Sequence, residues 1–159
     1  MDWLWSPWRY RYVSQAAPSQ ACIFCAKTQA GTDAENLVLF RGAHNFVLLN
    51  LFPYTNGHLM IAPYAHVASL AEAAPEALQE MILLARRAEA CLSEVYRPQG
   101  FNVGMNLGEC AGAGVPGHIH LHVLPRWTGD ASFMTAIGET RVIPEDLHET
   151  YRKLAAAFA

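Results

Sequence analysis

Charged residues are scarce in this chain of 159 residues. They make up 16% of the sequence, against roughly 25% in typical soluble domains, and hydrophobic residues make up 52%. We therefore expect part of the apolar surface to be covered by a second subunit. There is also no basic excess, because 11 Lys and Arg residues face 14 Asp and Glu residues. This balance excludes a protein that grips a long nucleic acid through many phosphates, although local donors could still hold one phosphorylated small molecule.

The sequence also lacks a stretch that could cross a membrane. Its longest segment without Asp, Glu, Lys or Arg, residues 42–71, contains prolines, asparagines, a glycine and histidines that divide it into short strands. No secretory signal is recognisable, because aromatic residues and arginines stand where an apolar segment and a cleavage site would be needed. We expect a cytoplasmic protein without a membrane partner, whose four cysteines are thiols or metal ligands.

No internal repeat or low-complexity tract divides the chain, and its length suits one domain over residues 1–159. The domain begins with an aromatic arm, residues 1–13, that we expect to pack on the body or on a partner subunit. Polar loops are expected over residues 14–20 and 29–35. Periodicity and turn residues predict strands over 36–41, 46–51, 58–63 and 101–106, a helix over 75–96 and a final helix over 144–158. The fold class is therefore α+β, with an antiparallel sheet of about five strands and two main helices.

Three histidines at alternate positions, His118, His120 and His122, give the clearest functional signal. In an extended strand they project to one face, while Ile119 and Leu121 enter the core from the other. Imidazole can act as a nucleophile, a proton donor or a metal ligand near neutral pH. The alternative is a histidine-rich surface strand without a function.

A loop of small residues, 108–117, runs directly into the histidine strand. At Gly112 and Gly114 the absence of a side chain lets backbone N–H groups approach phosphate oxygens. A neutral imidazole that attacks phosphorus forms a covalent intermediate and divides a difficult displacement into two steps. The loop and the histidines together predict a phosphate pocket beside a nucleophile.

Cys22 and Cys25 form a C-x-x-C motif with two interpretations. A redox dithiol is expected at the start of a helix after a buried strand, and no such strand precedes Cys22. A structural zinc site would need two more ligands from among the seven histidines, and spacing alone leaves that choice open. Cys91 and Cys110 are expected to be packed thiols.

The run from His118 to Arg126 resembles the signature of the histidine triad superfamily of nucleotide hydrolases and transferases. Further segments at 5–9, 49–54, 57–63, 100–108 and 125–130 resemble its branch of bacterial diadenosine tetraphosphate phosphorylases. The resemblance implies that His120 is the nucleophile, that His122 lies at the same phosphate and that His58 supports them. It also implies a homodimer in which paired protomers join their sheets.

The resemblance assigns further residues by position. Asn50 and Asn106 stand where the family holds the ribose and the first phosphate, and Trp127 where a side chain shapes the substrate pocket. In zinc-containing relatives the ligands match four positions of this chain: Cys22, Cys25, His66 and His118. Zinc would then brace the strand that carries the nucleophile. No residue pattern specifies a magnesium requirement.

The chain departs from many hydrolase branches just before the triad. It has Gly114 and Val115 where those branches have glutamine followed by serine or threonine. The missing glutamine leaves room for an acceptor other than water, which favours phosphorolysis. We therefore expect a nucleotidyltransferase that cleaves diadenosine tetraphosphate with orthophosphate to ATP and ADP. The alternatives are a hydrolase of dinucleoside polyphosphates or nucleotide conjugates using the same intermediate, and a non-catalytic nucleotide-binding module.

Overall fold

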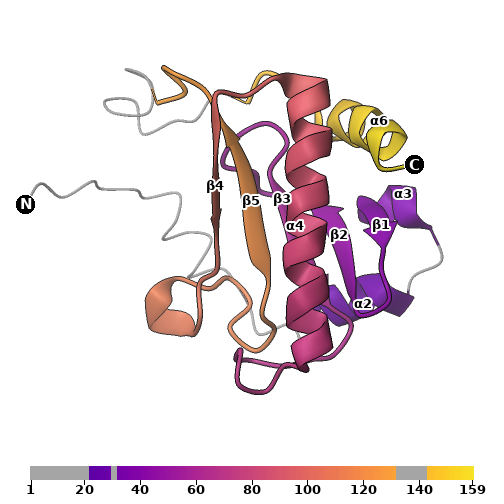
Figure 1. The fold of residues 1–159 in the computed structure, drawn as a ribbon, viewed down its shortest axis with the longest axis vertical. Helices are drawn as coiled ribbons and strands as arrows, with labels where there is room; N and C mark the ends of the chain where they lie inside the picture. Colours follow the sequence, from indigo (N-terminus) through magenta and orange to yellow (C-terminus); the bar gives the residue numbers. More distant parts are fainter. Residues whose placement is uncertain (1–21, 30–31, 132–142) are drawn as a thin grey trace, which may run out of the picture.

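The computed structural model describes residues 22–29, 32–131 and 143–159 (Figure 1). The aromatic arm predicted over 1–13 and the loop predicted over 14–20 lie outside the described residues. The described part contains the α+β architecture that the sequence predicts: one antiparallel sheet with helices packed against it. No helix among these residues is both long enough and apolar enough to span a bilayer.

Five strands form the sheet in the order β1-β2-β3-β5-β4, and all neighbours are antiparallel. The strands are β1 Val38–Arg41, β2 Asn45–Leu49, β3 Leu59–Pro63, β4 Gly100–Gly104 and β5 Leu121–Arg126. The four strands predicted from periodicity and turn residues are present with bounds shifted by at most two residues, whereas the histidine strand starts only at Leu121, so His118 and His120 precede it. The predicted sheet of about five strands is therefore confirmed.

The helix α4, Pro75–Tyr96, has the predicted bounds. Pro75 occupies its first turn, and Arg97 ends it in a left-handed conformation just before Pro98. The last helix, α6 Leu147–Phe158, starts later than predicted. Asp146 is its N-cap and accepts the backbone N–H of His148 at 2.8 Å, so Pro144 lies before the helix rather than in its first turn.

Two short helices were missed by the sequence analysis. They are α2 Ile23–Gln29 and α3 Asp33–Asn36, which occupy part of the predicted 29–35 loop and the predicted start of the first strand. Segments of seven and four residues span two turns or fewer, so no hydrophobic periodicity can develop. The C-x-x-C motif consequently lies at the start of α2.

The two faces of the sheet are packed differently. Val47, Ile61 and Val123 face α4 and belong to the main core, which also includes Ile119 and Leu121. The opposite face carries Phe46 and a smaller cluster around Phe24 of α2. Because strand side chains alternate, His122 of β5 falls on the α2 face, where it pairs with Met60 of β3. His118 and His120 precede β5, and their rings lie next to Phe24 of α2. Figure 1 shows α4 along one face and α2 near the end of the sheet.

The predicted hairpin turn joins β2 to β3 and brings Asn50 beside His58. The N–H of Asn50 donates to the carbonyl of His58 at 3.0 Å. Gly57 has φ of +71°, and a Cβ there would lie 2.8 Å from a methyl carbon of Leu92. Glycine is therefore required for the turn to pack under α4.

Glu80 of α4 ties the β1–β2 turn to the helix. Its carboxylate accepts the backbone N–H groups of Ala43, His44 and Asn45 at 2.7–2.8 Å, and the side-chain amide of Asn45 at 2.8 Å. Burial opposes its charge, but the hydrogen bonds prevail and lower the pKa of the carboxyl group. Four donors thus depend on one side chain.

We expect Glu80→Ala to lower the free energy of unfolding by about 2–3 kcal/mol, because several donors lose a charged acceptor. Urea denaturation at pH 7 measures this loss. Glu89→Ala, an exposed substitution in the same helix, is the control and should stay within about 0.5 kcal/mol of the parent. Equal losses in the two variants would contradict the role of Glu80.

Candidate active site and metal centre

His120 lies immediately before β5 and retains 4% exposure. Its Nδ1 is 2.9 Å from the carbonyl oxygen of His118. Because a carbonyl only accepts, Nδ1 carries the proton and Nε2 carries the lone pair. Burial lowers the pKa of His120, so the ring is neutral at pH 7. A neutral ring with an unprotonated Nε2 is the form that a nucleophile requires.

A chain of hydrogen bonds fixes the protons of the two other rings. The backbone N–H of Tyr54 donates to Nδ1 of His58 at 3.1 Å, so the proton of His58 is on Nε2. That Nε2 lies 2.9 Å from Nδ1 of His122 and donates to it. In neutral His122 the proton is therefore on Nε2. The result is a nucleophilic nitrogen on His120 beside a donor on His122, with ring centres 4.9 Å apart.

The electrostatics of the site favour neutral rings. Burial, with a smaller contribution from His120, lowers the pKa of His122 to about 4. His58 and His118 are both fully buried. This burial excludes the alternative of a histidine-rich surface strand. Ile119, Leu121 and Val123 lie in the main core, as predicted, and so on the side of the sheet opposite to the histidines.

The predicted substrate residues Asn50 and Trp127 differ in their relation to these rings. Asn50 contacts His58, with its Nδ2 donating to Nδ1 at 3.3 Å and its Oδ1 accepting the N–H of Phe52 at 3.0 Å. Trp127 follows β5, and its N–H donates to Asp130 at 3.2 Å. Within the described residues no ring contact joins Trp127 to the histidines.

More of the hydrogen bonds of the glycine-rich loop are formed within the loop than expected. Asn106 Nδ2 donates to the carbonyl of Gly112 at 3.5 Å, which closes the loop around the short helix η1, Glu109–Ala111. The N–H groups of Gly112 and Ala113 donate within the loop, to Glu109 and Gly108. Gly114 is exposed and follows these two bonded groups. The loop therefore offers fewer N–H groups to a phosphate than its composition suggests.

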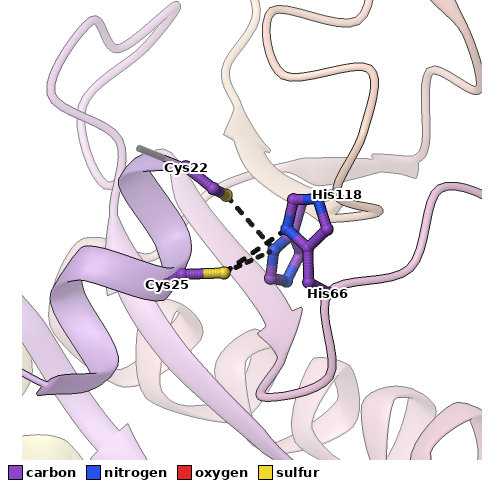
Figure 2. A group of neighbouring side chains, drawn as sticks. All are labelled: Cys22, Cys25, His66 and His118. Carbon is purple, nitrogen blue, oxygen red and sulfur yellow. Dashed lines mark hydrogen bonds between the residues drawn. The ribbon is translucent and has the colours of Figure 1, made fainter. Parts of the chain in front are cut away.

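Cys22, Cys25, His66 and His118 form one cluster. Their ligand atoms all lie within 4.8 Å of one another, and Figure 2 shows both sulfurs of the C-x-x-C facing the two imidazoles. Cys22 Sγ is 3.3 Å from Nδ1 of His118, and Cys25 Sγ is 3.4 Å from Nδ1 of His66. Such separations match the edges of a tetrahedron with Zn–S of about 2.3 Å and Zn–N of about 2.0 Å. The donor set fits a structural zinc ion.

The orientation of His118 also fits a ligand. Its Nε2 donates to the carbonyl of Pro63 at 2.8 Å, which leaves the lone pair of Nδ1 directed at the cysteines. The same residue offers its own carbonyl to His120. Phe24, between the two cysteines, lies with its ring centre 5.1 Å from His118 and 4.9 Å from His120. The four-residue Cys/His cluster and His120 are therefore in direct contact.

Comparison with known proteins places these features in a family. The sequence pattern of the HIT domain matches residues 32–129. The chain belongs to the HIT domain family. Over 164 residues it is 41% identical to a protein of Mycobacterium tuberculosis named AP-4-A phosphorylase, covering 98% of this chain and 84% of the relative.

Other relatives agree on family and fold. The HIT chain is 28% identical over 144 residues to the protein named hit of Bacillus subtilis, covering 89% of this chain and 97% of that one. A crystal structure of a zinc-bound histidine triad family protein from Mycobacterium smegmatis superposes with a TM-score of 0.70 at 31% identity, covering 88% of this chain and 94% of that chain. An enzyme acting on nucleotides is the function class that the family and the first relative support.

The metal centre generates a direct prediction. Cys25→Ser should lower the zinc content of purified protein from about one ion per chain to near zero, and should lower the melting temperature by roughly 6 °C or more. Elemental analysis and calorimetry measure both. Cys110→Ser is the control, because Cys110 lies outside the cluster and is exposed, so the packing expected for it was wrong, whereas Cys91 is buried as expected. Equal zinc contents in the two variants would exclude this site.

The histidine protonation states generate a second prediction. In an NMR titration, the imidazole C–H signals of His120 and His122 should both have midpoints below pH 6.5, with that of His122 near pH 4. The unfolded chain takes up these protons more readily, so unfolding becomes easier as the pH falls through this window. A midpoint at or above 6.5 for either ring would contradict the assignment of neutral rings.

Proposed function

We propose that this HIT protein is a nucleotidyltransferase that cleaves diadenosine tetraphosphate with orthophosphate. The observation that carries the proposal is the unprotonated Nε2 of His120, set by the bond from Nδ1 to the carbonyl of His118. The name of the 41% identical relative, AP-4-A phosphorylase, supports the substrate and the acceptor. The absence of glutamine and hydroxyl side chains at Gly114 and Val115 supports an acceptor larger than water.

The reaction proceeds in two displacements. The lone pair of His120 Nε2 attacks the phosphorus next to one adenosine, and the bond to the remaining chain of phosphates breaks to release ATP. The proton on Nε2 of His122 hydrogen-bonds an oxygen of that phosphorus and balances its charge. An oxygen of orthophosphate then attacks the adenylyl group, which releases ADP and restores the lone pair on His120.

The other site residues hold the reactants. His58 positions His122 through the hydrogen bond at 2.9 Å, and Asn50 contacts His58 at the ribose side. Asn106, with Gly112 and Gly114, borders the first phosphate, and Trp127 forms a wall of the pocket. Zinc, held by the four-residue cluster, would supply no chemistry at phosphorus and would fix the segment before β5.

The proposal includes a homodimer in the cytoplasm. Strand β4 is an edge of the sheet, and Val103 is 53% exposed there, so a second sheet could add to this edge. A reducing compartment keeps Cys22 and Cys25 as thiolate ligands rather than a disulfide.

Product analysis tests the reaction. With diadenosine tetraphosphate and orthophosphate, ATP and ADP should form in equal amounts, and mass spectrometry of quenched protein should find AMP on the peptide containing His120. His120→Asn should lower turnover by about 10³-fold or more and abolish the adduct. His44→Asn, at an exposed histidine of the β1–β2 turn, is the control.

The outcomes separate the candidate functions. ADP that forms only when phosphate is supplied supports the phosphorylase, whereas AMP formed regardless of phosphate identifies a hydrolase using the same intermediate. Tight nucleotide binding without an adduct, and without an effect of His120→Asn, would leave a non-catalytic binding module.

A further inference from the structure

A cavity opens on the same sheet face as the catalytic histidines. Its volume is about 240 Å³, and its lining includes Tyr54, Thr55, Asn102, Leu124, Arg126 and Asp130. None of the residues assigned above to the nucleophile, the phosphate loop or the metal cluster lines it. The function described so far therefore leaves this cavity without a role.

The register of β4 and β5 makes the cavity continuous with the active site. Leu124 and Arg126 follow His122 at alternate positions, so all three lie on one face, and Arg126 is about 13 Å along the strand. Opposite them on β4 stand Gly104, Asn102 and Gly100, and a Cβ at either glycine would meet no atom within 4 Å. Among the described residues, these two glycines therefore leave an open trough in the sheet surface beside His122 and beside Arg126 at the cavity.

Tyr54 contacts the catalytic rings and also lines the cavity. Its backbone N–H holds His58, its ring centre lies 4.9 Å from that of His58 and 6.4 Å from that of His122, and the residue also lines the cavity. A group bound in the cavity would therefore rest against an aromatic residue that contacts the catalytic rings.

The charges of the cavity suit an uncharged group. Arg126 donates to both carboxylate oxygens of Asp130, so these two opposite charges on the lining neutralise each other. Arg126 also donates to Oδ1 of Asn102, which turns the NH₂ group of Asn102 away from the guanidinium. An aromatic ring, an apolar floor at Leu124 and a few fixed amide and carboxylate groups are the chemistry that binds a nucleoside.

We propose that this cavity is the subsite for the second nucleoside of a dinucleoside polyphosphate, the one that leaves with the departing phosphates. The inference rests on the proposed function for the identity of the substrate. The volume agrees, because about 240 Å³ is below the range of pockets that enclose a whole drug-sized ligand, so the cavity takes one end of the substrate. The trough beside Gly104 and Gly100 carries the phosphates between the two ends.

Binding to protein that cannot turn over tests the subsite separately from catalysis. Isothermal titration of His120→Asn protein compares diadenosine tetraphosphate with adenosine tetraphosphate, which has the same phosphates and lacks the second nucleoside. We expect the dinucleotide to bind at least about 10-fold more tightly. Adding Asn102→Trp, which fills the cavity from an exposed position of β4, should remove most of that difference.

Two further variants make the result decisive. Ile82→Thr changes an exposed residue of α4, on the opposite side of the sheet, and should keep the full difference in affinity. Asn102→Ala should reduce the difference about threefold, and it replaces Asn102→Trp if that variant does not fold. Equal affinities for the two compounds, or a difference that both Asn102 variants retain, would overturn the subsite. Failure of the proposed function would appear elsewhere, as the absence of the adenylyl adduct on His120.

Discussion

The hydrogen bond from Nδ1 of His120 to the carbonyl of His118 is the constraint on which the site depends. It decides which nitrogen of His120 carries the lone pair, and it joins His120 to the residue that faces the two cysteines. His118 is in turn held by the carbonyl of Pro63 at the end of β3. One backbone segment thereby connects the sheet, the metal cluster and the reactive nitrogen. A metal ion at the cluster would fix the position of the carbonyl that sets the tautomer of His120.

Burial explains how such a site works with few charges. The α4 face of the sheet supplies the main hydrophobic core, and the opposite face places His118 and His120 beneath Phe24. Desolvation disfavours the protonated rings and lowers the pKa of His120 and His122, so both remain neutral where an exposed histidine would be partly charged. The hydrogen-bond chain through His58 then places each proton. The low charge content of the sequence is consistent with a site whose histidines are neutral and whose protons are placed by buried hydrogen bonds.

Much of this arrangement follows from the sequence, because period-two alternation depends only on the backbone. It predicts that the triad leaves Ile119 and Leu121 in the core, and the 22-residue helix α4 is long enough for its periodicity to define both ends. Other features depend on contacts distant in sequence. The tautomers of His58 and His122 require a backbone N–H from Tyr54, and spacing alone could not select His66 among seven histidines. The short helices α2 and α3, the N-cap Asp146 and the internal bonding of Gly112 lack a periodic signal of their own.

The Arg126–Asp130 ion pair joins the end of β5 to the residues that follow it. It closes the turn that carries Trp127 and borders the cavity next to Tyr54.

The central claim concerns a single atom, Nε2 of His120. The most direct measurement is a crystal structure of protein frozen after brief exposure to diadenosine tetraphosphate without phosphate. The account predicts continuous density from phosphorus to Nε2 of His120, with Nδ1 still bonded to the carbonyl of His118. AMP attached to any other residue, or to Nδ1, would contradict it.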